Sequence, residues 1–135
     1  MCPVENKCKL ENVVYKATVE NKNKKKAVYI GSTTTTFRKR YSNHKKSFNH
    51  EKYKNDTTLS AYLWDNNLQN DPKIKWEIVK KYDKYKPGGK LCQLCVEEKF
   101  HVIKGLRKTS NINKKTDIGS KCVHRRNATF AFAVT

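Results

Sequence analysis

Hydrophobic and polar positions alternate near the start of the chain and later recur at helical spacing. Residues 13–20 carry an apolar side chain at every second position, which predicts a half-buried strand. A second apolar run covers residues 27–33, and the lysine-rich segment 21–26 between the two runs predicts an antiparallel hairpin. From Thr36 onward the apolar positions recur every three or four residues, which predicts an amphipathic helix capped by the threonine run.

Both patterns return in the second half of the chain. A second helix is expected to begin near Thr57, and Ile74, Trp76 and Ile78 alternate with charged residues, as in a third strand. A third helix is expected over about residues 91–104, after a Pro-Gly-Gly break. The order ββααβα predicts an α+β fold, in which helices flank a small three-stranded antiparallel sheet.

The size and charge of the chain narrow the choice of partner. Its 135 residues predict a single domain over residues 1–135. The 30 basic and 12 acidic residues give a net charge of +18, so a polyanion is the expected partner. Nucleic acid is favoured over an anionic membrane, because the sequence has no basic amphipathic helix with an exposed apolar face. The absence of an apolar N-terminal core predicts an intracellular protein, nuclear in a eukaryote.

Four residues on separate predicted elements point to one chemistry: Tyr15, Tyr29, Arg40 and Glu98. Two phenols, one guanidinium and one inward-facing carboxylate can together cleave a phosphodiester bond. Glu98 is preferred to its neighbour Glu97 because it falls within the apolar stripe of the third helix, where a carboxylate needs a cation or a metal as its partner. This set of residues predicts a nuclease.

Three segments resemble the GIY-YIG nuclease family: Val14-Tyr15, Tyr29-Ile30-Gly31 and a helix with Phe37-x-x-Arg40-Tyr41-x-x-His44. The resemblance covers about residues 13–115, and Val13-Val14 stand where the family usually has glycine and isoleucine. It implies a metal-dependent endonuclease that acts on DNA, with RNA as an open alternative. Asn113 matches the downstream asparagine of the family, and Asn111 is a less favoured alternative.

The resemblance also implies a role for each residue. Glu98 would bind Mg²⁺ or Mn²⁺, and Arg40 would clamp the phosphate through two nitrogen donors. Tyr15, alone or with Tyr29, would orient or deprotonate the attacking water, provided that nearby cations lower the pKa of the phenol. His44 is expected one helical turn after Arg40, where it would pass a proton or hold another phosphate oxygen.

Each of these residues also has a purely structural interpretation. The tyrosines and His44 could be core packing, Arg40 could belong to a solvated helix face, and Glu98 could form an ion pair. Their ordered combination favours catalysis. The main alternative from another class is a nucleic-acid-binding module of the same fold that has lost catalysis.

Backbone contacts with the nucleic acid are expected from small and basic residues around this set. At Gly31 the lack of a side chain would let the protein backbone approach a phosphate closely. The other expected contacts are Ser32, Arg38, Lys39, Lys45, Lys46, Arg125 and Arg126. Such contacts position a duplex without reading its sequence.

The cysteines permit two interpretations. Their number, five, is odd, and a reducing compartment argues against a disulfide framework, so thiols or metal ligands are expected. If the terminal extensions 1–12 and 116–135 meet, a closed Cys₃His zinc site would form from Cys2, Cys8, Cys122 and His124, with Cys92 and Cys95 as a competing pair. This arrangement resembles the nuclease domain of Penelope-like retroelements. The alternative for the cysteines is that they are ordinary buried thiols. For the function of the protein, a zinc-stapled interaction domain is a third possibility, after the nuclease and the nucleic-acid-binding module.

Overall fold

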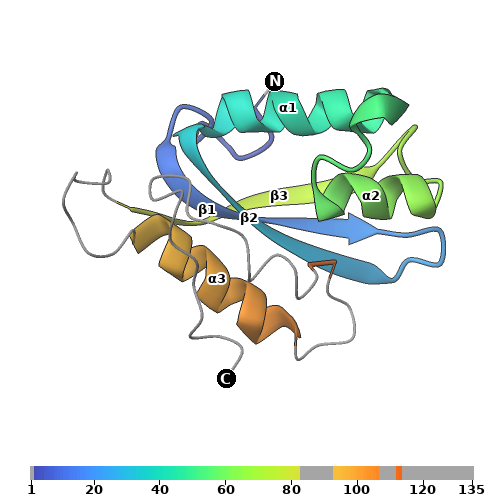
Figure 1. Cartoon of the computed structure of the whole chain (residues 1–135). Coiled ribbons are helices and arrows are strands. Elements are labelled where there is room, and N and C mark those ends of the chain that lie inside the picture. The colour runs from blue at the N-terminus through green and yellow to red at the C-terminus, as the bar shows by residue number, and fades with distance from the viewer. Residues whose placement is uncertain (1, 83–92, 107–111, 114–135) are drawn as a thin grey trace.

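The computed structural model of the chain describes residues 2–82, 93–106 and 112–113 (Figure 1). Its elements are, in order, β1 (Glu11–Glu20), β2 (Lys26–Thr36), α1 (Phe37–Asn49), the short 3₁₀ helix η1 (Glu51–Tyr53), α2 (Thr58–Asp65), β3 (Lys73–Lys81) and α3 (Gln93–Leu106). The predicted order ββααβα and the α+β class are confirmed.

The strands form one antiparallel sheet in the order β2-β1-β3. The central strand, β1, is the most apolar, and Val13, Val14 and Tyr15 have no exposed surface. Tyr15 pairs with Gly31 on one side and with Ile78 on the other. Successive side chains of a strand point to opposite faces, so this register decides which residues can meet on each face.

Helices cover both faces of the sheet (Figure 1). α1 and α2 lie over one face, where the larger core gathers, and α3 lies over the other, where a smaller core forms. The larger core includes Tyr15, Tyr29, Phe37, Phe48, Leu59, Leu63 and Trp76. The smaller core includes Val14, Ile30, Tyr82, Leu94, Cys95 and Val102. Tyr15 and Val14 are adjacent in β1, so two neighbouring residues of this strand belong to different cores.

The first two helices begin at the expected threonines. The Thr36 hydroxyl accepts a hydrogen bond from the Lys39 N–H at 3.3 Å, and the Thr57 hydroxyl accepts one from the Ser60 N–H at 3.0 Å. A threonine oxygen at this position satisfies one of the free N–H groups of the first helical turn. The cap at Thr36 sets the start of α1, the helix that carries Arg40.

The N-terminal loop, residues 2–10, packs on the domain. Val4 and Cys8 are buried in the larger core. The Leu10 and Cys8 carbonyls accept hydrogen bonds from the first two N–H groups of α1, at 2.9 and 2.8 Å. The described part of the expected extension 1–12 is therefore continuous with the body of the domain.

Candidate active site

Tyr15 lies at the centre of a hydrogen-bonded cluster beneath α1. Its hydroxyl is 2.6 Å from Nε2 of His44 and accepts a hydrogen bond from Nε of Arg40 at 3.2 Å. Arg40 and His44 are four residues apart on α1, so they lie on the same face of the helix. The ring of Phe37 stacks on the ring of Tyr15 at 5.3 Å between centroids. The predicted meeting of Tyr15, Arg40 and His44 is thus observed.

His44 is a neutral imidazole in this environment. Burial lowers its pKa to about 3, and the nearby Arg40 charge acts in the same direction. Arg40 already donates to the Tyr15 oxygen, so the phenol proton is placed to point at Nε2 of His44, which assigns the remaining imidazole proton to Nδ1. Within the described part of the chain, Nδ1 has no hydrogen-bond partner. His44 therefore accepts a hydrogen bond from the Tyr15 hydroxyl.

Tyr15 is held as a neutral phenol. Burial raises its pKa to about 12, although Arg40 opposes this shift through its charge and its hydrogen bond. The condition that nearby cations lower the pKa of this phenol toward working pH is not met, because desolvation of a fully buried side chain outweighs one guanidinium. Tyr15 can act in proton transfer only if another group takes its proton.

The position of Tyr15 explains why residue 31 is a glycine. A Cβ atom at this position would lie 2.5 Å from the Tyr15 hydroxyl oxygen and 2.6 Å from Cζ, closer than atoms can approach. Gly31 is buried, and it faces Tyr15 across the β1–β2 pair. Its predicted role as an approach for phosphate is replaced by a packing role, because the glycine makes room for the phenol.

Tyr29 completes the aromatic surroundings of the cluster. Its ring centroid is 6.5 Å from that of Tyr15 and 6.0 Å from that of His44. Burial by itself would lower the pKa of Arg40. The neighbouring Tyr15, followed by Tyr29 and Glu98, outweighs burial, so the pKa of Arg40 is raised overall. Arg40 is thus a permanent cation that faces both phenols, as predicted.

Glu98 reaches the cluster from the opposite side of the sheet. It lies on α3, which packs on β2 and β1 on the face away from α1 (Figure 1). Its carboxylate nevertheless acts on both Tyr15 and Arg40, since it contributes to raising the pKa of each. Its side chain is 19% exposed. Two helices on opposite faces therefore contribute charged groups to one site.

Lys99 is a member of the site that the sequence interpretation missed. Its side chain is only 5% exposed, and Nζ lies 3.3 Å from Oε1 of Glu98. The signal was present in the sequence, since Lys99 follows Cys95 by four positions and precedes Val102 by three, within the apolar stripe of the helix. The ion pair that was one structural interpretation of Glu98 is observed.

The donor set around Glu98 fits one kind of metal. Magnesium binds through one or two protein carboxylates and keeps several waters, so a single carboxylate beside a phosphate site suffices. The described residues contain no group of three or more histidine, cysteine or acidic side chains placed to share a metal. Magnesium at Glu98 therefore stays a prediction.

Asn113 holds the backbone of β2. Its Oδ1 accepts a hydrogen bond from the Ile30 N–H at 2.7 Å, and its Nδ2 donates to the Ile30 carbonyl at 3.0 Å. Ile30 lies between Tyr29 and Gly31, so this pair of bonds fixes the strand where it meets the cluster. The structure gives Asn113 a positioning contact, while Asn111 lies outside the described residues.

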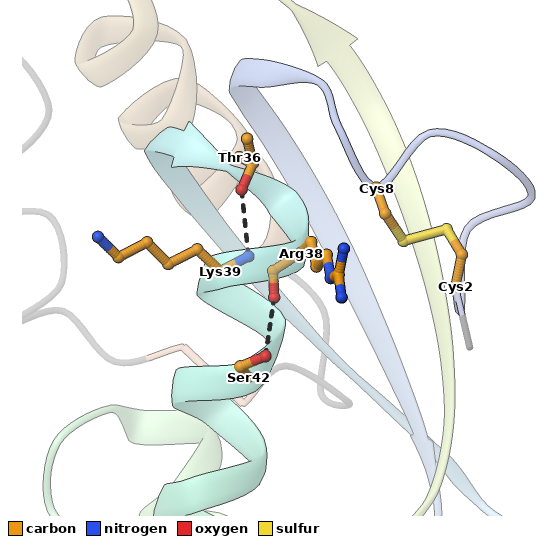
Figure 2. The surroundings of a disulfide bond; sticks show 6 residues. All are labelled: Cys2, Cys8, Thr36, Arg38, Lys39 and Ser42. Carbon is orange, nitrogen blue, oxygen red and sulfur yellow. Dashed lines mark hydrogen bonds between the residues drawn. A yellow bond between two sulfur atoms is a disulfide. The ribbon is translucent and has the colours of Figure 1, made fainter.

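Cys2 and Cys8 form a disulfide (Figure 2). Glu5 and Asn6 have φ angles of 45° and 65°, and the resulting turn brings the two Cα atoms to 5.8 Å. The expectation that both residues are thiols or zinc ligands is wrong for this structure, because each sulfur is bonded to the other. Cys95 is buried in the smaller core, and Cys92, Cys122 and His124 lie outside the described residues.

The outer face of α1 is basic. Arg38, Lys39, Lys45 and Lys46 are exposed, as expected for backbone contacts, and Ser32, which follows Gly31 in β2, is half-buried. Arg125 and Arg126 lie outside the described residues. Among the helices that the structure describes, none is long and apolar enough to cross a membrane.

Comparisons with family models, curated proteins and solved structures found no match to this chain. The functional interpretation therefore depends on the residues and their geometry. They define an α+β domain with a buried Tyr–His–Arg cluster, a carboxylate that acts on it from the other face of the sheet, and a basic surface beside it.

Proposed function

We propose that this domain is a metal-dependent endonuclease of the GIY-YIG type that hydrolyses DNA phosphodiester bonds. The observation that carries the proposal is the set of contacts made by the Tyr15 hydroxyl. This hydroxyl is hydrogen-bonded to both Arg40 and His44, and the Glu98 carboxylate acts on the same phenol and guanidinium. A purely structural tyrosine would need only one of these partners.

Arg40 would bind the scissile phosphate. Its Nε–H is used by Tyr15, and no acceptor among the described residues takes the two Nη groups. A guanidinium binds two phosphate oxygens through parallel N–H groups and cannot lose its charge at working pH. The bond to Tyr15 would aim the free edge of Arg40 at the substrate before it arrives.

Tyr15 would orient the attacking water as a neutral phenol. Arg40 occupies the lone pair of the Tyr15 oxygen that a water would need, so its movement onto a phosphate would make room for that water. The water would then donate to the Tyr15 oxygen while the phenol keeps its hydrogen bond to Nε2 of His44 over the 2.6 Å contact. The proton of the water would leave to a phosphate oxygen or to solvent, because a pKa of about 12 disfavours a free phenolate and a pKa of about 3 disfavours a protonated His44.

Glu98 would hold the divalent cation, which when bound neutralises the charge that develops on the phosphate and the leaving oxygen. Lys99 contacts one carboxylate oxygen, Oε1, and this contact orients the group. The net charge of +18 favours DNA, a polyanion, as the substrate.

The direct test is nicking of supercoiled plasmid DNA with Mg²⁺, with Mn²⁺ and with EDTA. Wild-type protein is expected to convert supercoiled to relaxed plasmid in either metal and to do nothing in EDTA. Arg40→Ala, purified in parallel, serves as the control for contaminating nucleases and is expected to be inactive. Equal nicking by wild type and Arg40→Ala would contradict the proposal.

A non-enzymatic nucleic-acid-binding module is the second candidate, and the Glu98–Lys99 ion pair favours it, because that pair satisfies the carboxylate without a metal. Such a module would bind the plasmid in a gel-shift assay yet leave it supercoiled in both metals. The nicking assay separates the two functions.

A further inference from the structure

A cationic cavity lies beside the disulfide, on a different side of α1 from Tyr15. It has a volume of about 510 Å³ and is lined by Cys2, Asn6, Cys8, Lys9, Arg38 and Tyr41. The Arg38 side chain points toward the disulfide, whereas Lys39 extends in the opposite direction (Figure 2). We propose that this cavity is a second phosphate subsite, which binds a backbone phosphate of the nucleic acid other than the one that is cleaved.

The charge of the cavity is uncompensated. The described residues that line it include two cations, Lys9 and Arg38, and no acidic residue. In the part of the chain that the structure describes, neither cation forms an ion pair with a carboxylate. Both side chains are exposed, so they are available to an anionic ligand.

A neighbouring cavity on the other side of the same loop provides the contrast. It has about 440 Å³, and its lining includes Lys7 and Lys75 but also Glu5 and Glu77. Lys75 Nζ lies 3.2 Å from Oε1 of Glu77. Two cations in this second cavity are thus balanced by two carboxylates. Of these two cavities, judged by the described residues that line them, the one beside the disulfide has the net positive lining.

The side chains rather than the helix terminus would bind the phosphate. The first three N–H groups of α1 already donate, to the Leu10 carbonyl, the Cys8 carbonyl and the Thr36 hydroxyl. The guanidinium of Arg38 can instead bind two phosphate oxygens, with Lys9 as a second charge. Tyr41 provides a fixed wall, because its ring packs on Trp76 at 5.4 Å.

The subsite would act together with the cleavage site. Arg38 and Arg40 are two residues apart on α1, so their side chains leave the helix in different directions. Phe37 contacts both Tyr15 and Tyr41, which connects the two places through one ring. The inference rests on the proposed function for its ligand, a DNA backbone, and it adds a contact outside the scissile phosphate that would fix the duplex.

The test is binding of a fluorescent DNA duplex, followed by anisotropy in EDTA at several salt concentrations. Lys9→Ala/Arg38→Ala removes both cations of the subsite. Lys7→Ala/Lys75→Ala removes the same charge from the balanced cavity on the same loop. The subsite variant is expected to bind about 10-fold more weakly. Its salt slope is expected to fall by about 0.9, since the two cations together bind one phosphate and each phosphate contact contributes about 0.9.

The matched control is expected to keep nearly the wild-type affinity and salt slope. Equal weakening of both double variants would overturn the inference, because it would show that only total charge matters. Failure of the wild-type protein to bind the duplex would also overturn the inference. Thermal unfolding of each variant should match wild type, as expected for exposed side chains. If wild type fails to nick DNA but the two variants still differ in binding, the nuclease proposal fails and the subsite stands.

Discussion

The two faces of the sheet contribute to the proposed site in different ways. On the α1 face, Tyr15, His44 and Arg40 are joined by hydrogen bonds inside an aromatic core, and two of the three side chains are neutral. On the α3 face, Glu98 and Lys99 form a charged pair at the border of the smaller core. Under the proposed function, the buried half, on the α1 face, would orient the attacking water and bind the phosphate through Arg40, and the ionic half, on the α3 face, would hold the metal.

The buried half is most sensitive at Gly31. Gly31→Ala would place Cβ against the Tyr15 hydroxyl, and overpacking of this kind costs about 1–3 kcal/mol of unfolding free energy. Displacement of Tyr15 is expected to slow plasmid nicking about 100-fold. Thr34→Ala, in the same strand, is the control and should leave both quantities near wild type. A Gly31→Ala protein of normal stability and activity would contradict the packing role.

Removal of the hydroxyl alone tests the hydrogen bonds. Tyr15→Phe keeps the ring but leaves Nε of Arg40 and Nε2 of His44 without their partner. The unfolding free energy is expected to fall by about 1–3 kcal/mol, measured by urea denaturation, and nicking should be lost. Tyr62→Phe, a half-buried tyrosine on α2, is expected to change neither. Retained nicking by Tyr15→Phe would remove the phenol from the mechanism.

The neutral state of His44 predicts a dependence of stability on pH. Its pKa is lowered to about 3 in the folded protein, so the unfolded chain binds the extra proton between about pH 3 and 6.5. The stabilisation is complete above pH 6.5 and is lost as the pH falls toward 3. Between pH 6.5 and 5 the loss is expected to be about 2 kcal/mol.

The contribution of His44 is isolated by comparing variants. In His44→Gln the difference in unfolding free energy between pH 6.5 and 5 should shrink by about that amount. His50→Gln, which changes an exposed histidine, should behave as wild type. Identical pH dependence in His44→Gln and wild type would show that His44 is not kept neutral by its surroundings.

The ionic half is expected to respond more mildly. Lys99→Met keeps the length and packing of the side chain but frees Oε1 of Glu98 from its cationic partner. The Mg²⁺ concentration for half-maximal nicking is expected to fall on the order of 5-fold, because a competing positive charge is removed. Lys104→Met, on the exposed end of α3, is the control. A rise in the Mg²⁺ requirement would mean that Lys99 supports the metal site.

Local patterns predicted the fold well. The alternation at residues 13–20, the threonine caps and the helical spacing from Phe37 each depend on near neighbours in the chain, and all correspond to observed elements. The meeting of Tyr15 with Arg40 and His44 was also predictable, because the spacing on α1 puts both residues on one face.

Features that depend on tertiary structure were missed. The role of Gly31 depends on strand register, and the Cys2–Cys8 bond depends on a turn with positive φ angles. The raised pKa of Tyr15 reflects complete burial, which composition does not reveal. Lys99 was not singled out, although it is next to its partner Glu98 and lies within the same apolar stripe.

The division between the two faces is tested most directly by two neighbouring carboxylates on α3. Glu98→Gln and Glu97→Gln change the charge equally and lie one residue apart, but only Glu98 acts on Tyr15 and Arg40. With saturating Mg²⁺, Glu98→Gln is expected to nick supercoiled plasmid at least about 100-fold more slowly than wild type, and Glu97→Gln at nearly the wild-type rate. Full nicking by Glu98→Gln would contradict the account.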